Sequence, residues 1–495
     1  MNSSTHRIIK HSTIYAIGNI LRQIASFIML PIYTHFLSPA DYGVVGLLTF
    51  AMSIAEAFFG ARLGEAMPKY YFQEEAPDRK NAVISTAFII TASSSAVAAA
   101  ALFLLKADTS TILFGSEKYA LIVGLFGIMM LTQPVESYGM TYIRIVQRPV
   151  LFITMSLTKL ILQLALNIGL IVGLKLGVLG VVISGLVASS TYAVVLTVFT
   201  TYKTGSRFDW GIGKSMLSFC WPLWFVGLAS IYIYSSNRYY IRIFSSLNDV
   251  GLYELAAKFG MILVLIAWQP FNQFWETERF NLYRQANSQR IFSTVFQFLG
   301  LILSIAAVCI GVTAEPVIRI MSSTEFHEAY LAVPILTMAF LLGSFTNFAN
   351  FSFMVTDKTK IISYLSYVTV AAVSILNLAL IPTYGFVGAA IALAGAMLVQ
   401  FLLSFYKGRA LYDMGIDLRL TLIYLLIISV VFVLGALVVR ADDIWWDIAL
   451  KAALLIPSIA ILMFVFWRNA TDQSYVRQLL RPLCERLPGL RPSST

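Results

Sequence analysis

The stretch that decides the fold is Phe36-Leu37-Ser38-Pro39-Ala40-Asp41-Tyr42-Gly43, which returns 208 residues later as Phe244-Ser245-Ser246-Leu247-Asn248-Asp249-Val250-Gly251. Phe, Ser, Asp and Gly recur in the same order, and each copy stands where one apolar segment ends and the next begins. A repeated helix-exit motif in an apolar chain predicts two related halves. Such doubling is typical of membrane transporters, whose substrate sites lie between the repeats.

The composition predicts an integral membrane protein. Hydrophobic residues make up 58% of the 495 residues and charged residues only 12%, about half the charge of a soluble domain. The first apolar run, from Ser12, is too long for the core of a signal peptide, so we expect a retained helix.

Spans of about 20 mostly apolar residues predict an all-α, multi-pass fold. The runs are too continuous for the short alternating strands of a membrane barrel. Fourteen segments qualify as spanning helices, namely 12–37, 43–61, 82–105, 119–141, 150–173, 178–201, 216–237, 251–274, 292–314, 330–355, 361–382, 386–406, 420–439 and 444–467.

Lys and Arg in the connecting segments predict the orientation of the chain. Taking alternate connections, one set, which includes both ends of the chain, holds 24 basic residues, and the other holds 8. By the positive-inside rule, both termini are therefore cytoplasmic. Much of the net charge of +10 is thus a topology signal scattered over short loops, which argues against a nucleic-acid partner. The longest connection, 62–81, leaves no room for a soluble catalytic domain.

The 208-residue offset pairs the first six predicted helices with the next six. Because six is an even number, both copies enter the membrane from the same side, as in a parallel repeat related by an axis along the membrane normal. The predicted organisation is a six-helix lobe over 1–210, a second over 211–410, two further helices over 411–467, and a basic cytoplasmic tail over 468–495 that contacts anionic headgroups.

Basic side chains inside apolar segments are candidate site residues, because each costs about 2.5–3.5 kcal/mol at bilayer depth on insertion scales. Arg22 lies in the first helix with no acidic residue within a turn, and Lys159 lies in the fifth. Arg238, beside Asn237 and one turn from Arg242, lies at the end of the seventh. Guanidinium groups bind phosphate in a bidentate manner. These five residues therefore predict a site for a pyrophosphate between the two lobes.

Acidic side chains in the apolar segments have a different interpretation. Glu56 and Glu136 are candidates for proton or ion coupling. Glu254 and Lys258 are spaced i,i+4 with Glu first, which favours a mutual ion pair on one helix face. Whether this pair is structural or lines the cavity stays open.

The sequence offers no pattern for catalytic or cofactor chemistry. Cys220, Cys309 and Cys484 have neither a disulfide framework nor metal-ligand spacing. Nucleophile elbows and phosphate-cradling glycine loops are also absent from the sequence. We therefore expect no cofactor, no metal and no enzymatic activity.

The motifs resemble those of the polysaccharide flippases in the multidrug/oligosaccharidyl-lipid/polysaccharide exporter superfamily. Arg22 followed by Leu37-Ser38-Pro39-Ala40-Asp41-Tyr42-Gly43 is similar to an arginine and an "L-G-P-x-x-Y-G" helix exit. Pro222, Arg238 and the run Asp249-Val250-Gly251-Leu252-Tyr253, with Ala256, Ala257 and Lys258, are similar to "P…D-R…E-V-G-x-Y-x-x-A-x-K". Asn237 stands where that pattern has Asp.

The resemblance implies translocation of polyprenyl-pyrophosphate-linked oligosaccharides, precursors of O-antigen or exopolysaccharide, across the bacterial cytoplasmic (inner) membrane. It implies alternating access of the two lobes, with the two last helices forming a groove for the lipid tail. Membrane lipids, a polysaccharide polymerase and chain-length machinery are the implied partners. The sugar composition, the coupling ion and the oligomeric state do not follow from it.

Two other functions remain as alternatives. An ion-coupled multidrug exporter of the same fold would favour acidic cavity residues for cationic drugs, and the basic residues Arg22, Lys159 and Arg238 argue against it. A membrane glycosyltransferase or polymerase usually needs a sizeable outward loop with catalytic residues. The longest outward connections, 106–118 and 315–329, are too short for that.

Overall fold

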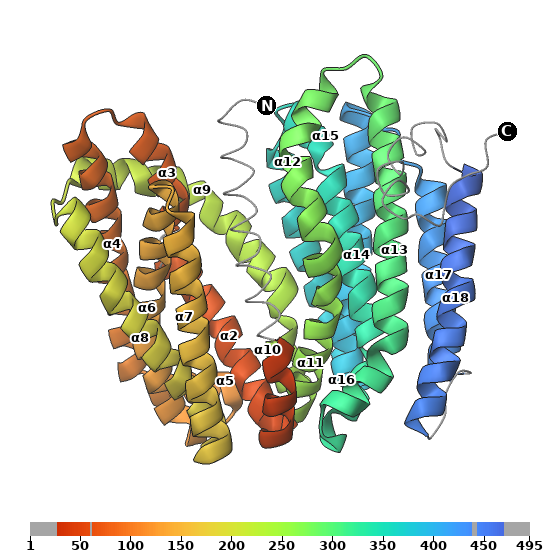
Figure 1. The fold of residues 1–495 in the computed structure, drawn as a ribbon, viewed down its shortest axis with the longest axis horizontal. Helices are drawn as coiled ribbons and strands as arrows, with labels where there is room; N and C mark the ends of the chain where they lie inside the picture. The colour runs from red at the N-terminus through yellow and green to blue at the C-terminus, as the bar shows by residue number, and fades with distance from the viewer. Residues whose placement is uncertain (1–26, 60–61, 438–442, 470–495) are drawn as a thin grey trace. The chain divides into compact units, whose positions relative to one another are not determined.

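The regular structure of the chain is helical throughout the residues that the computed structural model describes, which are 27–59, 62–437 and 443–469 (Figure 1). Twelve helices in these ranges are long and apolar enough to cross a membrane. The predicted all-α, multi-pass membrane fold is therefore confirmed. Much of the first predicted helix, 12–37, lies outside the described residues, and its end forms the helix Phe27–Phe36.

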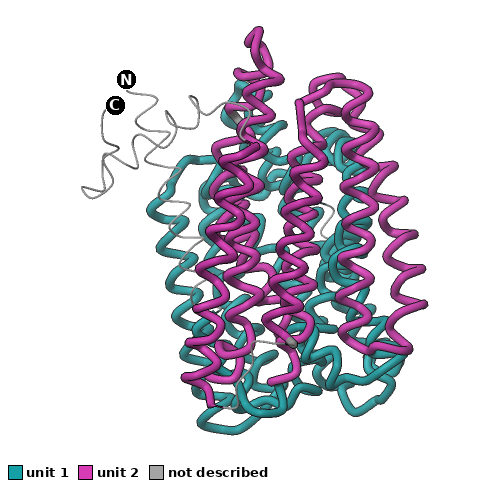
Figure 2. Tube along the Cα trace, turned by 90° about the vertical axis from the view of Figure 1, so that its right-hand side faces the viewer, with its two compact units in different colours: residues 1–254, 321–326 teal, residues 255–320, 327–495 magenta. Residues whose placement is uncertain are grey.

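The chain divides into two compact units (Figure 2). Unit 1 comprises Met1–Glu254 and Met321–Phe326, and unit 2 comprises Leu255–Ile320 and His327–Thr495. In unit 1, the helix Phe27–Phe36 is followed by α2 (Pro39–Phe59), α3 (Leu63–Gln73), α4 (Pro77–Leu104), α5 (Lys106–Phe114), the short η1 (Glu117–Tyr119) and α6 (Ala120–Ile145). Next come α7 (Pro149–Asn167), the π-helical η2 (Ile168–Gly173), α8 (Gly177–Thr204), α9 (Trp210–Ser235), α10 (Asn237–Phe244) and the start of α11 (Leu247–Leu263).

Unit 2 continues from α11. Its elements are η3 (Val264–Trp268), α12 (Gln269–Tyr283), α13 (Ser288–Met321), η4 (Thr324–Leu331), α14 (Val333–Ala349), α15 (Phe351–Val355), α16 (Lys360–Leu411), α17 (Leu418–Leu437) and α18 (Ile444–Asn469). The last residue of α13 and the start of η4 belong to unit 1.

Helix α9 packs in unit 1, although the 208-residue offset of the motif places it at the start of the predicted second lobe. Its residues Ile212, Met216 and Cys220 lie in one buried cluster with Leu63 and Met67 of α3. The boundary between the compact units therefore falls in α11, some forty residues after the predicted lobe boundary.

Helix α16 consists of two spans that fold back on each other. Its 52 residues would measure about 78 Å as one straight helix, far more than a hydrocarbon core of about 30 Å. Gly385 interrupts it with φ 53° and ψ −134°, a conformation open to glycine. A Cβ on Gly388 would stand 2.4 Å from the carbonyl oxygen of Leu380, eight residues away and about 12 Å along a straight helix. The predicted helices 361–382 and 386–406 thus form one helical hairpin, α16. Two of the predicted spans therefore belong to a single element of the structure.

The serine of the repeated motif caps two helices. Ser38 precedes α2, where the backbone N–H of Asp41 donates to its Oγ at 3.2 Å, and Asp41 accepts from the Ser38 N–H at 3.2 Å. Ser246 precedes α11, where the N–H of Asp249 donates to its Oγ at 3.1 Å. At α2 the two bonds are reciprocal, as in a capping box, which pairs the free donors of the first helical turn, whereas at α11 the Asp249 carboxylate accepts from Ser245 Oγ at 2.5 Å. Ser recurs because both helices need a capped start.

The glycines of the motif bring its two copies into direct contact within unit 1. A Cβ on Gly43 would lie 2.3 Å from the carbonyl oxygen of Leu247, and a Cβ on Gly251 would lie 1.9 Å from that of Pro39. Pro39 and Leu247 are equivalent under the 208-residue offset, as are Gly43 and Gly251. Each glycine therefore faces the same carbonyl of the other copy, which is the reciprocal pattern of a two-fold contact.

The connection 62–81 between predicted spans contains a short helix, α3, that the sequence analysis did not predict. Leu63, Ala66 and Met67 are buried, and their i, i+3, i+4 spacing gives α3 one short apolar face. Its other positions mix Glu65 and Lys69 with Gly64, Pro68 and the aromatic run 70–72, which hid the helical period in the sequence. The connection 106–118 likewise contains α5.

Buried charges join α18 to α13 in unit 2. Lys451 Nζ lies 2.6 Å from Glu315 Oε2 and 2.9 Å from Asp447 Oδ2, and Arg319 Nη2 lies 2.7 Å from Glu315 Oε1. The side chains of Lys451, Glu315 and Asp447 are at most 3% exposed. These four residues, the Glu315 network, attach α18 to α13.

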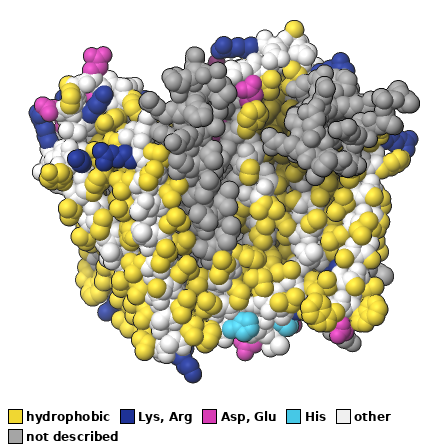
Figure 3. All heavy atoms as spheres, in the orientation of Figure 1, with side chains coloured by type: hydrophobic (Ala, Val, Ile, Leu, Met, Phe, Trp, Pro, Cys, Tyr) yellow, Lys and Arg dark blue, Asp and Glu magenta, His cyan; other side chains and the backbone are white. Residues whose placement is uncertain are grey.

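The distribution of hydrophobic and basic side chains on the surface agrees with a membrane location. Figure 3 shows hydrophobic side chains over much of the visible surface, with Lys and Arg mainly towards the upper edge of the view. This distribution fits an apolar belt bordered by a basic side, as the positive-inside rule requires.

Candidate functional site

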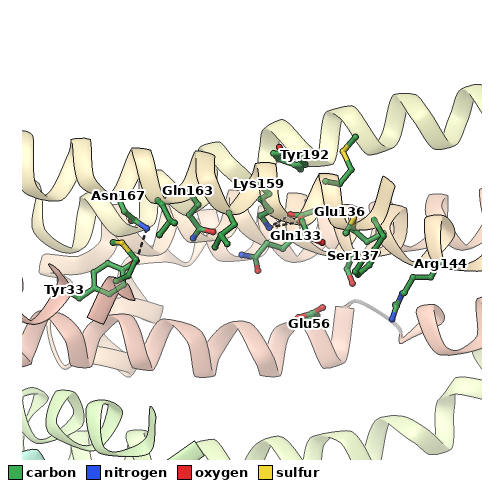
Figure 4. A pocket seen from close by; sticks show the side chains of 17 residues that line it. Tyr33, Glu56, Gln133, Glu136, Ser137, Arg144, Lys159, Gln163, Asn167 and Tyr192 are labelled. Atoms are coloured by element: carbon green, nitrogen blue, oxygen red, sulfur yellow. Dashed lines mark hydrogen bonds and ion pairs between the residues drawn. The ribbon is translucent and has the colours of Figure 1, made fainter. Parts of the chain in front are cut away.

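A cavity of about 800 Å³ lies within unit 1, between the helix Phe27–Phe36 and helices α2, α6, α7 and α8 (Figure 4). This volume falls in the range of small-molecule sites, roughly 300–1,000 Å³. The described residues that line it are Met29, Tyr33, Glu56, Gln133, Glu136, Ser137, Met140, Arg144, Phe152, Met155, Ser156, Lys159, Leu160, Gln163, Leu164, Asn167 and Tyr192.

Helical spacing brings the polar lining residues of α6 and α7 to one face each. On α6, Gln133, Ser137 and Arg144 follow one another at intervals of four and seven residues. On α7, Ser156, Lys159, Gln163 and Asn167 recur at intervals of three and four. Residues at such intervals share one helix face. Each of these apolar spans therefore carries a polar stripe, and both stripes border the cavity.

Lys159 and Glu136 form an ion pair across the cavity wall between α7 and α6. Lys159 Nζ donates to both carboxylate oxygens of Glu136, at 2.7 and 2.6 Å, and Figure 4 shows the two side chains pointing towards each other. Their side chains are 25% and 12% exposed. The pair is neutral as a whole but accessible, so a ligand with its own charges can exchange with either partner.

Two charged side chains reach the cavity without an ion-pair partner among the described residues. Glu56 of α2 faces the Lys159–Glu136 pair, and Arg144 lies at one end of the cavity (Figure 4). Arg144 Nη2 donates to Thr141 Oγ1 at 2.9 Å, and its guanidinium carbon lies 6.0 Å from the centre of the Phe152 ring. These contacts orient the guanidinium but leave its charge available to an anion.

The opposite end of the cavity is polar and uncharged. Asn167 Nδ2 donates to the hydroxyl of Tyr33 at 2.9 Å, and its Oδ1 accepts from Ser184 of α8. The cavity thus runs from the guanidinium of Arg144, past the central ion pair, to a group of amides and hydroxyls. Such a gradient suits a ligand with a charged head and a hydroxyl-rich body.

Of the site residues predicted from the sequence, Glu56, Glu136 and Lys159 line this cavity. Arg22 lies outside the described residues. Asn237, Arg238 and Arg242 lie on α10 and are not among the residues that line the cavity.

The α10 residues are engaged with other parts of unit 1. Arg238 Nε is bonded to Glu254 Oε1, and its Nη1 donates to the Tyr234 carbonyl at 2.9 Å. Asn237 is fully buried and donates to the Tyr253 hydroxyl at 2.8 Å. Arg242 Nη2 donates to the Thr111 carbonyl at 3.1 Å, in the last turn of α5. Glu254, which the i,i+4 rule assigned to Lys258, is thus a partner of Arg238.

Sequence reasoning missed Arg144, which it counted only as a loop charge of the basic set. It also missed Gln133, Gln163 and Tyr192. A signal was present, because glutamines inside apolar spans at helical spacing from Lys159 and Glu136 mark a polar stripe. The Glu315 network was missed for another reason. Glu315 and Lys451 are 136 residues apart along the chain, and two of the four residues lie near helix ends.

A family of sequences described as polysaccharide biosynthesis proteins matches residues 32–331, which include most of this cavity. The chain belongs to this family. No curated protein gives a significant match to the chain.

Solved structures share the fold. The lipid II flippase MurJ, in an inward closed conformation, matches with a TM-score of 0.75 and 13% identity over 94% of this chain and 100% of MurJ. An inward-facing multidrug resistance MATE family transporter of the MOP superfamily matches with a TM-score of 0.57 and 15% identity, over 80% of this chain and 97% of that one. The MATE multidrug transporter DinF-BH matches with a TM-score of 0.56 and 16% identity, over 83% of this chain and 96% of that one. The family and the fold together confirm the resemblance drawn from the sequence.

Proposed function

We propose that this protein translocates polyprenyl-pyrophosphate-linked oligosaccharide repeat units, precursors of O-antigen or exopolysaccharide, across the cytoplasmic membrane, with both termini in the cytoplasm. The observation that carries the proposal is the cavity in unit 1, which combines an accessible guanidinium with amides and hydroxyls. Membership of a polysaccharide biosynthesis family and the MurJ-like fold support a lipid-linked saccharide as the cargo. The protein then acts as a transporter rather than an enzyme.

In this proposal Arg144 holds the pyrophosphate and the amides of α6 and α7 bind the sugars. Lys159 adds a second cation when the phosphates displace Glu136, and the released carboxylate takes up a proton. Glu56 is the second candidate for ion coupling. The membrane potential contributes about 2.3 kcal/mol per charge for each 100 mV. Charge-assisted hydrogen bonds of the guanidinium to phosphate provide the specificity.

The predicted ligands Arg22, Arg238, Arg242 and Asn237 remain part of the proposal. Each of the three α10 residues already donates to a protein group in this conformation, so we expect full contact with a substrate only after α10 releases Glu254, Thr111 and Tyr253. Alternating access supplies such a change, since it opens the site to one side of the membrane at a time.

Depletion of the protein followed by lipid analysis tests the function. We expect polyprenyl-linked repeat units to accumulate in the cytoplasmic leaflet while surface polymer falls. A multidrug exporter of the same fold is the alternative, supported by the MATE transporter structures. Unchanged lipid-linked intermediates together with a new sensitivity to cationic drugs would establish that alternative and exclude the flippase.

Replacing Arg144 with glutamine should weaken substrate binding without affecting folding. A charge-assisted hydrogen bond contributes about 1.5–3 kcal/mol, so we expect a loss of roughly tenfold to a hundredfold in affinity. The measurement is transport of lipid-linked repeat units into the outer leaflet of proteoliposomes. Arg148→Gln is the matched control, because Arg148 is an exposed arginine four residues away that does not line the cavity. Equal transport by both variants would show that Arg144 does not bind the substrate.

A further inference from the structure

Unit 2 contains a buried cation for which the described residues supply no ion-pair partner. Four charged side chains are buried in the described residues, and three of them, Glu315, Asp447 and Lys451, belong to the Glu315 network. The fourth is Arg279 of α12, which is 8% exposed. Within the described ranges it makes no ion pair, and its Nε has no hydrogen-bond acceptor. A buried charge without a partner is strongly unfavourable.

A second unsatisfied donor lies one helical turn away. Trp275 is 1% exposed, and its indole Nε1 also lacks an acceptor among the described residues. Residues spaced i,i+4 are neighbours on one helix face. Since roughly nine in ten or more buried polar groups are paired in native proteins, two adjacent orphan donors indicate a missing acceptor.

One aromatic cluster encloses both donors. The Phe292 ring lies edge-on to Trp275 at 5.2 Å and stacks on Phe351 at 5.3 Å, measured between ring centres. The guanidinium carbon of Arg279 lies 5.1 Å from the centre of Phe351 and 5.4 Å from that of Phe280. Stacking on two rings holds the planar guanidinium in place. The rings fix its orientation but do not neutralise its charge.

The carboxylates closest in sequence are directed elsewhere. Glu276 is exposed and accepts from Asn272 Nδ2 at 2.8 Å, and Glu278 accepts from Asn281 Nδ2 at 3.4 Å. Burial lowers the pKa of Arg279, while the nearby charge of Glu276 acts in the opposite direction. The part of the chain that the structure describes therefore leaves a place for an anion from outside.

The position of Arg279 identifies the source of that anion. The apolar span ends at Glu276, so Arg279 follows it by three residues, in the connection that also carries Arg284 and Arg290 of the basic set. This is the depth of lipid headgroups on the predicted cytoplasmic side. Basic pockets between helices on that side bind anionic headgroups.

We propose that Arg279 and Trp275 form a binding site for the phosphate of an anionic membrane phospholipid, separate from the transport cavity in unit 1. The guanidinium donates to two phosphate oxygens through its fork, and the indole N–H, one turn deeper, donates to a further oxygen. The buried rings of the aromatic cluster exclude water from the site.

The test uses the full-length protein in phosphatidylcholine nanodiscs, prepared with and without phosphatidylglycerol. Retained phosphatidylglycerol is counted by native mass spectrometry, and the unfolding temperature is measured on the same samples. We expect Arg279→Gln to weaken retention about tenfold, as loss of a charge-assisted bond implies, and to abolish the rise in unfolding temperature caused by the lipid. Arg284→Gln, an exposed arginine of the same connection, should behave as wild type. An equal loss in both variants would show diffuse attraction to the basic surface and overturn the site.

Further variants and a competition experiment test the assignment to a lipid phosphate. Trp275→Phe retains the ring and removes the indole donor, so it should weaken retention less than Arg279→Gln does, and it serves if that variant does not fold. Wild-type retention in Trp275→Phe and in Arg279→Lys would overturn the site. Inorganic phosphate and pyrophosphate are titrated into phosphatidylcholine nanodiscs as competitors. Binding of either anion at Arg279 without any preference for phosphatidylglycerol would assign a free phosphate instead and refute the lipid.

Discussion

Gly251→Ala should yield little folded protein, because the new Cβ would stand 1.9 Å from the backbone carbonyl oxygen of Pro39. A side-chain neighbour can rotate away, but here the obstacle is backbone at the capped start of α2. We expect destabilisation at or above the ~1–3 kcal/mol typical of overpacked sites. The unfolding temperature and the monodisperse yield after detergent extraction measure it.

Gly169→Ala is the control for this prediction, since a Cβ on Gly169 meets nothing within 4 Å. Gly43→Ala should resemble Gly251→Ala, because its Cβ would lie 2.3 Å from the Leu247 carbonyl oxygen. Both variants disrupt one contact, so their effects should not add in the double variant. If Gly251→Ala melts at the temperature of Gly169→Ala, the close reciprocal contact is not present in the folded protein.

Lys451→Met should have the second large effect. It removes the lysine that contacts the buried carboxylates of both Glu315 and Asp447, and removing one partner of a buried ion pair costs about 3–5 kcal/mol. We expect a marked fall in unfolding temperature. Adding Asp447→Asn should restore part of the loss, because one uncompensated charge is then gone.

Arg409→Gln provides the comparison for the Glu315 network. It breaks an ion pair with Asp413 whose side chains are 61% and 37% exposed, and such surface pairs contribute at most about 1 kcal/mol. Similar stability of Lys451→Met and Arg409→Gln would contradict a buried network between α13 and α18.

The fold was largely predictable from the sequence because membrane spans are marked by length and composition. The repeated motif also predicted two related halves, and its Ser, Asp and Gly each have a structural reason in the capping and crossing of α2 and α11. The turn at Gly385 was also predicted, because it falls between the predicted helices 361–382 and 386–406. The short helices α3 and α5 were not predicted, since their apolar faces are narrow.

The candidate site was predictable where a charge interrupts an apolar run. Lys159, Glu136 and Glu56 stood out for that reason, and all three line the cavity. Arg144 did not, because a basic residue at a helix end also serves as a topology marker. The acidic partners of Arg238 and Lys451, Glu254 and Glu315, lie 16 and 136 residues away along the chain, and only the packing of helices brings such residues together.

The reciprocal contact of Gly43 and Gly251 has an evolutionary consequence. A half-length ancestor carrying one serine cap, one exposed carbonyl and one glycine would present both sides of this crossing to a second copy of itself. Such a polypeptide could assemble as a parallel homodimer without being fused to its copy. In one fused chain the two copies are free to differ elsewhere, while this crossing still needs the residues that a symmetric partner requires.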